Sequence, residues 1–189
     1  VGALAVTVGL YAPVALMGAK APEVVYFLKV DPTKPYTDSK DLFASNYNKS
    51  DRFYYFNAQP GSYVAVAAFY KVSAQPGSGS STTSKAGGGT VTVSIQPGPT
   101  DYITFFSEEV AKSTLVKLDS GKVSYMGNLT VDMSLKLEGA DKLQTHISNL
   151  IKPGALNTSL GKSMLSGSYN YIGTLKKNDT SDTSKKEFK

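Results

Sequence analysis

The sequence predicts a mainly β protein, namely an antiparallel β-sandwich of about seven to nine strands with one short helix near residues 140–151. Three observations lead to this prediction. Apolar side chains alternate with polar or small ones in several segments, and Pro-Gly pairs that favour turns lie between them. A hydrophobic content of 41%, with 12 tyrosines and 8 phenylalanines, is enough to fill a core. We expect one domain over residues 1–175 with a flexible loop at 74–89, then a disordered, lysine-rich tail at 176–189.

The segment 51–72 is the densest in strand-forming residues, and we expect it to form a hairpin at the core. Pro60 and Gly61 suit the two corners of a type II turn, since proline fixes φ and glycine accepts a positive φ. The run after the turn is apolar on both faces, which is typical of a central strand that is covered twice. Alternation places Val64, Val66, Ala68, Tyr70 and Val72 on one face, and Tyr63, Ala65, Ala67 and Phe69 on the other.

The first 19 residues carry no charge, which raises the question of a membrane helix. Their bulky residues alternate with small ones, however, and a period of two predicts a strand, then a break near Pro13 and a second short strand through Leu16. No basic segment precedes the apolar run, as it would in a signal peptide. We expect the numbering to begin inside a longer precursor.

Six further segments have strand patterns, and one has a helical pattern. In the long segment 121–137, apolar and polar residues alternate from Asn128 onward, and Gly127 is placed for a bulge. In the helix predicted at 140–151, Leu143, Ile147, Leu150 and Ile151 share one face, with Asp141 in the first turn. The other predicted strands are 23–31, 90–95, 102–106, 114–118 and a last one within 167–175; a long polar connection spans 31–49.

Charge and residue usage argue against several classes of function. The net charge of +5 is mild, and the lysines are scattered instead of forming the stripe typical of nucleic-acid binders. The chain has no cysteine, which excludes disulfides, thiolate nucleophiles and cysteine metal sites. His146 is the only histidine, so a Ser–His–Asp site would depend on it alone, and no Gly-x-Ser-x-Gly motif supports one.

The acidic residues do not form a recognisable site either. Glu108 and Glu109 are adjacent, so on a strand their carboxylates would point to opposite faces. The aspartates of the polar connection lack the spacing and closing glutamate of a calcium loop; they are Asp31, Asp38, Asp41 and Asp51. We therefore predict no catalytic, cofactor-binding or metal-binding residues, no cofactor and no enzymatic activity.

Two kinds of residue remain as candidates for contact with other molecules. Aromatic residues near the 59–62 turn could present a ligand or glycan platform, although core packing is the more common role at strand spacing; they are Tyr54, Tyr55, Tyr63 and Tyr70. Asn-x-Ser/Thr sequons, which accept glycans in eukaryotic secreted proteins, occur at Asn48, Asn128, Asn157 and Asn178. If the chain binds a partner, the loops 31–49 and 74–89 are better candidates than the hairpin.

Two stretches resemble bacterial exported lipoproteins built on small PEGA or transthyretin-like β-sandwich modules. The first is 56–69, where an aromatic strand meets Pro60-Gly61-x-Tyr63 and an apolar strand. The second is 118–131, with its string Gly121…Tyr125-Met126-Gly127-Asn128-Leu129. The resemblance implies a non-enzymatic protein tethered through a lipidated N-terminal cysteine. This sequence has no cysteine, so such an anchor would lie upstream of Val1, have been removed, or never have existed.

The leading functional hypothesis is a non-catalytic, exported bacterial envelope protein of the outer membrane or cell surface, with a structural or adhesion role. A periplasmic or extracellular location is the alternative. Its partners would be other envelope or surface proteins, with self-association possible and no nucleic acid. The second hypothesis is a subunit of an extracellular or surface assembly, in which residues 1–10 pair with a neighbour's sheet edge. The third and least favoured is a hydrolase that uses His146.

Overall fold

The structure is a computed structural model that describes residues 1–11, 19–20, 22–72, 80–86, 89–95, 100–134, 140–151 and 169–186. The strands are β1 (Gly2–Tyr11), β2 (Ala19–Lys20), β3 (Val24–Val30), β4 (Leu42–Ala44), β5 (Tyr47–Lys49), β6 (Arg52–Ala58), β7 (Gly61–Val72), β8 (Ser80–Ala86), β9 (Gly89–Ile95), β10 (Thr100–Phe106), β11 (Val116–Leu118), β12 (Val123–Ser134) and β13 (Tyr169–Asp179). The helices are the short 3₁₀ helix η1 (Tyr36–Asp38), α1 (Glu108–Ser113), α2 (Lys142–Ile151) and α4 (Asp182–Lys186).

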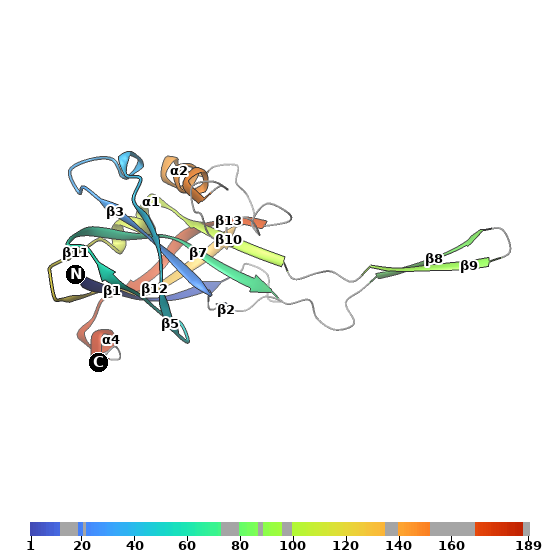
Figure 1. The fold of residues 1–189 in the computed structure, drawn as a ribbon, viewed down its shortest axis with the longest axis horizontal. Coiled ribbons are helices and arrows are strands. Elements are labelled where there is room, and N and C mark those ends of the chain that lie inside the picture. Colours follow the sequence, from blue (N-terminus) through green and yellow to red (C-terminus); the bar gives the residue numbers. More distant parts are fainter. Residues whose placement is uncertain are drawn as a thin grey trace.

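Eleven of these strands form one mixed, curled sheet (Figure 1). Its order is β4-β3-β7-β10-β13-β12-β1-β6-β5, with β11 paired to β7 and β2 paired to β1. Two pairs, β1 with β12 and β10 with β13, are parallel. The prediction of a mainly β protein is therefore confirmed, but the described strands give a mixed sheet curled like a half-barrel in place of an antiparallel sandwich. The remaining strands, β8 and β9, pair only with each other.

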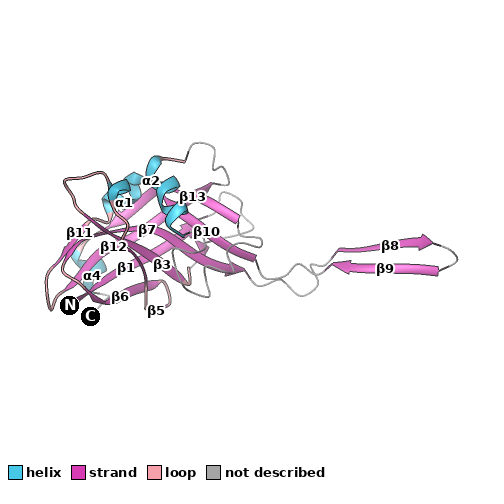
Figure 2. Ribbon diagram, turned by 45° about the horizontal axis from the view of Figure 1, so that its top comes forward, coloured by secondary structure: helices cyan, strands magenta, loops and turns pink. Residues whose placement is uncertain are grey.

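The two faces of the curled sheet bury two separate apolar clusters. The inner cluster draws on strands that are far apart in the sheet order, which requires the sheet to fold around it; it includes Leu4, Val8, Phe27, Phe53, Tyr63, Tyr70, Leu129 and Met133. The second cluster lies between β3, β7 and β10 on one side and α2 on the other; it includes Tyr26, Leu28, Phe69, Ile103, Leu143 and Ile147. Figure 2 shows α1 and α2 together on this outer side, away from α4.

The prediction that residues 51–72 form a hairpin is wrong. The strands β6 and β7 form as expected, but they do not pair with each other: β6 lies between β1 and β5, and β7 lies between β3 and β10. Gly61 does take a positive φ, but at 152° it is far more extended than the second corner of a type II turn, which is near 80°. The Pro-Gly pair is therefore a corner that carries the chain between two separate parts of the sheet.

The strand β7 is central and apolar on both faces, as predicted, but its alternation slips once. Tyr26 of β3 pairs with Ala67 while Phe27 pairs with Ala65, so Val66 is one extra residue, a β-bulge. Tyr63, Ala65, Ala68 and Tyr70 consequently face the inner cluster, and Val64, Val66, Ala67 and Phe69 face the helices. A strict period of two could not predict this exchange.

The strand β1 is confirmed, and both of its edges are occupied. β12 pairs along one edge and β6 along the other, while β2 pairs with residues 10 and 11. The bulge predicted at Gly127 is also present: Ala5 and Thr7 pair with Tyr125 and Asn128, and Gly127 has a φ of 115°. The second short strand predicted through Leu16 lies outside the described residues.

The expectation of a single helix is incomplete. The segment 108–113 is a further helix, α1, which begins at Ser107 with its hydroxyl accepting a hydrogen bond from the Val110 N–H. The tail predicted at 176–189 instead completes β13 and forms α4 over the residues that the structure describes. Within the predicted loop 74–89, residues 80–86 are the strand β8. The predicted helix at 140–151 is confirmed as α2.

A candidate binding surface of aromatic and basic side chains

The segment 42–49 joins the two outer strands of the curled sheet. β4 pairs with β3 and, only two residues later, β5 pairs with β6. Between them, the backbone N–H of Ser45 donates to the Val25 carbonyl at 2.8 Å, and the Val25 N–H donates to the Ser45 hydroxyl at 3.1 Å. Asn48 extends the contact, since its side-chain amide donates to the Glu23 carbonyl at 3.1 Å. This polar connection therefore closes the curl.

Asn46 makes the corresponding bonds to β6. Its backbone N–H donates to the Tyr54 carbonyl at 2.9 Å. Its side-chain amide donates to the Phe56 carbonyl at 3.0 Å and accepts from the Phe56 N–H at 2.9 Å. One side chain thus replaces a strand partner for both polar backbone groups of Phe56, and it fixes the position of that residue on the sheet edge.

Three aromatic rings cluster on the outer face of β5 and β6. The ring centroids of Tyr54 and Phe56 lie 5.5 Å apart with their planes 7° from parallel. The Tyr47 ring lies 5.6 Å from Tyr54 and 5.8 Å from Phe56, tilted by 50° and 44°. These side chains occupy the face opposite Phe53 and Tyr55, which contribute to the inner cluster.

The cluster is open to solvent even though its base is buried. Tyr47 is 51% exposed and Phe56 is 42% exposed. On the neighbouring strand, the small residues Ala3 and Ala5 pair with Phe56 and Tyr54 and are buried. The aromatic positions of β6 end at Asn57, which is an extra residue opposite β1. Its φ of 63° is a left-handed conformation that asparagine tolerates better than most residues.

Basic side chains lie beside the rings. Lys49 pairs across the strands with Arg52, on the same face as Tyr47 and Tyr54 because positions two apart on a strand share a face. Lys49 is exposed, and no ion pair among the described residues holds it. Asp51, in the turn between Lys49 and Arg52, is the nearest acidic residue along the chain.

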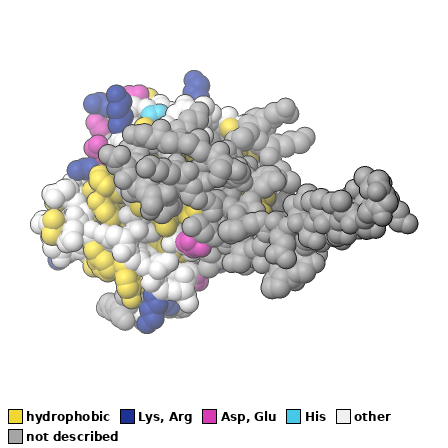
Figure 3. Space-filling model, turned by 45° about the vertical axis from the view of Figure 1, so that its right-hand side comes forward, with side chains coloured by type: hydrophobic (Ala, Val, Ile, Leu, Met, Phe, Trp, Pro, Cys, Tyr) yellow, Lys and Arg dark blue, Asp and Glu magenta, His cyan; other side chains and the backbone are white. Residues whose placement is uncertain are grey.

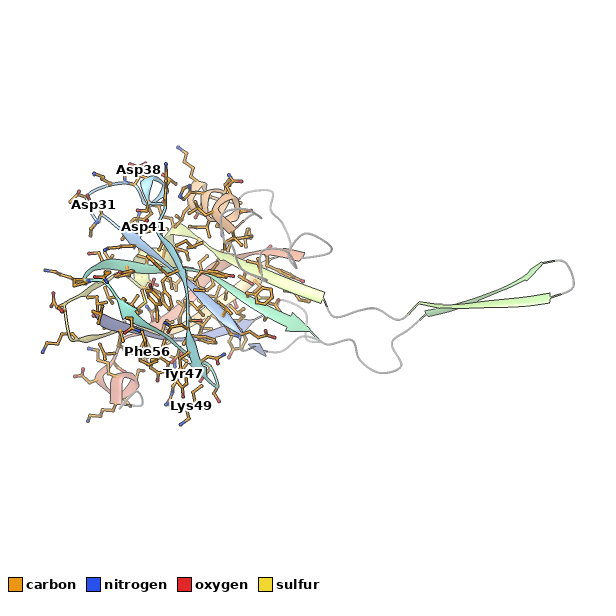
Figure 4. All side chains as sticks on the ribbon, viewed as in Figure 1. Asp31, Asp38, Asp41, Tyr47, Lys49 and Phe56 are labelled. Atoms are coloured by element: carbon orange, nitrogen blue, oxygen red, sulfur yellow. The ribbon has the colours of Figure 1, made fainter. Side chains whose placement is uncertain are left out.

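Figure 4 shows this surface in the context of the molecule. Figure 4 places Tyr47, Lys49 and Phe56 together on one side, with Asp31, Asp38 and Asp41 at the opposite side. Figure 3 shows hydrophobic side chains gathered low on one face with Lys or Arg side chains below them. We call the residues Tyr47, Lys49, Arg52, Tyr54 and Phe56 the aromatic–basic surface.

Only one of the four aromatic candidates from the sequence belongs to this surface. Tyr54 lies on it, whereas Tyr63 and Tyr70 are buried in the inner cluster and Tyr55 packs against that cluster. Burial raises the pKa of all three inward-facing tyrosines above the ordinary value. The sequence pattern does not identify Tyr47 or Phe56 as surface rings, although Tyr47 and Lys49 fall inside the loop 31–49 that the sequence favours for binding.

The acidic candidates do not converge. Asp31, Asp38, Asp41 and Asp51 are all exposed, and the carboxylate of Asp31 is used locally, accepting from the N–H and hydroxyl of Thr33. These bonds hold the pKa of Asp31 below its usual value. Within the described ranges, no three His, Asp or Glu residues lie close enough together to hold a metal ion.

His146 has a structural contact. Its Nε2 lies 2.7 Å from the carbonyl oxygen of Ser39, which can only accept, so Nε2 carries the proton and donates. This bond ties α2 to the loop that leads into β4. Glu108 lies in the first turn of α1 and forms an exposed ion pair with Lys112 at 2.8 Å. Glu109 is also exposed, so these residues do not face a shared site.

The sequons differ in accessibility. Asn178 is half-buried, and its amide donates to the Ser113 carbonyl at 2.7 Å and to the Met126 carbonyl at 3.1 Å. Its amide nitrogen is therefore used in hydrogen bonds within the fold. Asn48 is exposed on β5, although its amide donates to the Glu23 carbonyl, and Asn128 is exposed on β12. Asn157 lies outside the described residues.

Comparison of the chain with protein-family models, curated proteins and solved structures found no match. In the part of the chain that the structure describes, every helix is too short or too polar to cross a membrane. Conclusions about function therefore depend on the aromatic–basic surface. An exposed cluster of rings with an adjacent ammonium group can contact a flat, partly apolar ligand and a negative charge at the same time.

Proposed function

We propose that the chain is a non-catalytic bacterial envelope protein, exported to the outer membrane or cell surface, with a structural or adhesion role. The observation that supports a binding role is the aromatic–basic surface, because Tyr47 and Phe56 are large apolar side chains that the fold leaves about half exposed. The polar connection 42–49, which ties the outer strands of the curled sheet together, supports a rigid presentation of this surface. The resemblance of 56–69 and 118–131 to exported lipoproteins, and to their PEGA or transthyretin-like sandwich, remains part of the proposal.

Two alternatives have less support. Assembly through residues 1–10 would require β1 to leave β12 or β6, since both of its edges are paired within the chain. A hydrolase that uses His146 would have to release Nε2 from its bond to the Ser39 carbonyl. Neither alternative has an observation in its favour that the envelope role lacks.

The proposal is tested by locating the chain in bacteria that produce it from its native precursor. Intact cells are treated with a protease that does not enter them, and the chain is detected with an antibody before and after treatment. The proposal predicts loss of the signal from intact cells, while a cytosolic marker survives. A chain that is protected in intact cells and recovered with the cytosolic marker would contradict it.

A further inference from the structure

We propose that the aromatic–basic surface binds an acidic polysaccharide, with sugar rings against the aromatic rings and a sugar carboxylate against Lys49. This inference depends on the proposed envelope role, because it names the ligand class of the same surface. It is carried by three features of the described residues: the arrangement of the rings, the position of the charge, and the location of both on the face of a strand pair.

The rings offer a ligand one continuous apolar surface. Tyr54 and Phe56 stack against each other, parallel to within 7° with centroids 5.5 Å apart, and Tyr47, which is 51% exposed, is tilted against both. The face of an aromatic ring carries partial negative charge, which attracts the weakly positive C–H groups on one side of a sugar ring. Tyr47 also carries a hydroxyl that can donate to or accept from sugar hydroxyls.

The charge selects an acidic ligand. Lys49 and Arg52 are paired across β5 and β6, one residue pair beyond Tyr47 and Tyr54. Their side chains share the face of the rings, so a chain of sugars lying over the rings meets an ammonium group as it continues. Asp51 lies two residues beyond Lys49, in the turn, and forms no ion pair with Lys49 in the described part of the chain. A neutral polysaccharide would leave this ammonium group without a counter-charge.

The position of the rings favours a polymer over a lipid bilayer. Tyr54 and Phe56 lie on the face of paired strands, alternating with residues of the inner cluster, and not at the tip of a loop. A bilayer surface is reached most easily by protruding apolar side chains, whereas rings on a sheet face contact a ligand that lies along the strands. Binding to anionic lipid is kept as an outcome of the test.

The test is direct binding of the full chain to three probes: alginate, which is a polymer of uronic acids, neutral dextran, and vesicles that contain phosphatidylglycerol. We expect binding to alginate, with little binding to the other two. Raising the ionic strength from about 0.01 to 0.15 M should weaken alginate binding, because the screening length falls from about 30 to 8 Å.

Substitutions test whether alginate binds at the aromatic–basic surface. Tyr47→Thr and Phe56→Thr keep a strand-forming residue while removing a ring, and each should weaken alginate binding by about three- to tenfold. Lys49→Gln should weaken it by roughly two- to fivefold. Matched controls are Tyr11→Thr and Lys117→Gln on β11, and both should bind like the wild type. The Tyr11 ring is also 42% exposed, but among the described residues it contacts Lys176, 5.0 Å from the ring centroid, and no other ring. Circular dichroism and melting temperature confirm that each variant is folded.

Alginate binding that is absent, or equal in the ring variants and the wild type, would overturn the inference. Binding to the lipid vesicles in place of alginate would overturn it as well. If the chain is exposed on cells but does not bind alginate, the ligand assignment fails while the proposed envelope role stands. If the chain is cytosolic, the envelope role fails whatever it binds.

Discussion

The closure of the curled sheet by Asn46 can be tested with a single substitution, Asn46→Ala. This change removes the side-chain amide that donates to the Phe56 carbonyl at 3.0 Å and accepts from the Phe56 N–H at 2.9 Å. It leaves the backbone bond from Asn46 to Tyr54 in place. The substitution therefore loosens the joint between β5 and β6 without deleting a strand.

The size of the effect follows from these two bonds. A hydrogen bond within a protein contributes about 0.5–1.5 kcal/mol to stability, and an exposed one lies at the low end because water replaces the lost partner. Asn46 is exposed, so we expect a total loss of about 1–2 kcal/mol in the free energy of unfolding. The matched control is Asn128→Ala, an exposed asparagine in a strand whose side chain forms no hydrogen bond to the other described residues. Its loss of stability should stay within about 0.5 kcal/mol.

Urea unfolding measures this loss as a lower midpoint with an unchanged slope. Amide hydrogen exchange measures it locally, because the Phe56 N–H should exchange at least about tenfold faster once Asn46 Oδ1 is gone. An Asn46→Ala protein with the stability of the wild type and an unchanged Phe56 exchange rate would refute the role assigned to this side chain.

Three further predictions concern the fold. Asp141→Ala should lower the free energy of unfolding, measured by urea titration, by about 1–3 kcal/mol. The Asp141 carboxylate caps α2 by accepting from the Gln144 N–H, and it also accepts from the N–H of Glu108, the first residue of α1, at 2.6 Å. An unchanged urea midpoint would contradict this prediction. Gly127→Ala should lower the free energy of unfolding at least twice as much as Gly121→Ala. Both glycines have a positive φ, but only at Gly127 would an added Cβ overlap the Asn178 side chain. Equal losses of stability in the two variants would contradict this prediction. Burial raises the pKa of Tyr26 to about 12, so its contribution to the free energy of unfolding is present below pH 10 and should fall by about 2–3 kcal/mol as the pH rises to 12. In unfolding experiments at several pH values, Tyr26→Phe should reduce that fall, and a pH profile identical to that of the wild type would exclude this contribution.

Alternation in the sequence predicted which segments become strands because a half-buried strand needs one apolar face. This was sufficient for β1, β3 and β12, including the glycine bulge at Gly127. It could not predict partners, since the pattern fixes the face of a side chain and not the neighbouring strand. The parallel pairing of β1 with β12 joins segments more than 100 residues apart, and no local signal specifies it.

The Pro60-Gly61 pair shows why the expected hairpin failed. A Pro-Gly sequence permits a reversal of the chain but does not require the two flanking strands to pair. The available edges decided the outcome: β6 completes the outer side beside β1, and β7 fills the place between β3 and β10. The slip at Val66 has the same origin, because a bulge depends on the partner strand.

The candidate surface was predictable only in part. The sequence favours the loop 31–49 as a contact region, and Tyr47 and Lys49 belong to it. Phe56 and Tyr54 could not be assigned to the outer face, because β6 has aromatic residues on both of its faces and the sequence does not say which face is covered. Which rings remain exposed depends on the curl of the whole sheet.

The most direct test of the binding role is adhesion of bacteria that display the full chain. Cells producing the wild type, the double variant Tyr47→Thr with Phe56→Thr, or the control Tyr11→Thr are compared on an alginate film at equal amounts of surface protein. The double variant should adhere at least about tenfold less than the wild type, because it loses two of the three rings, and the control should adhere normally. Equal adhesion of the double variant and the wild type would contradict the role of the aromatic–basic surface.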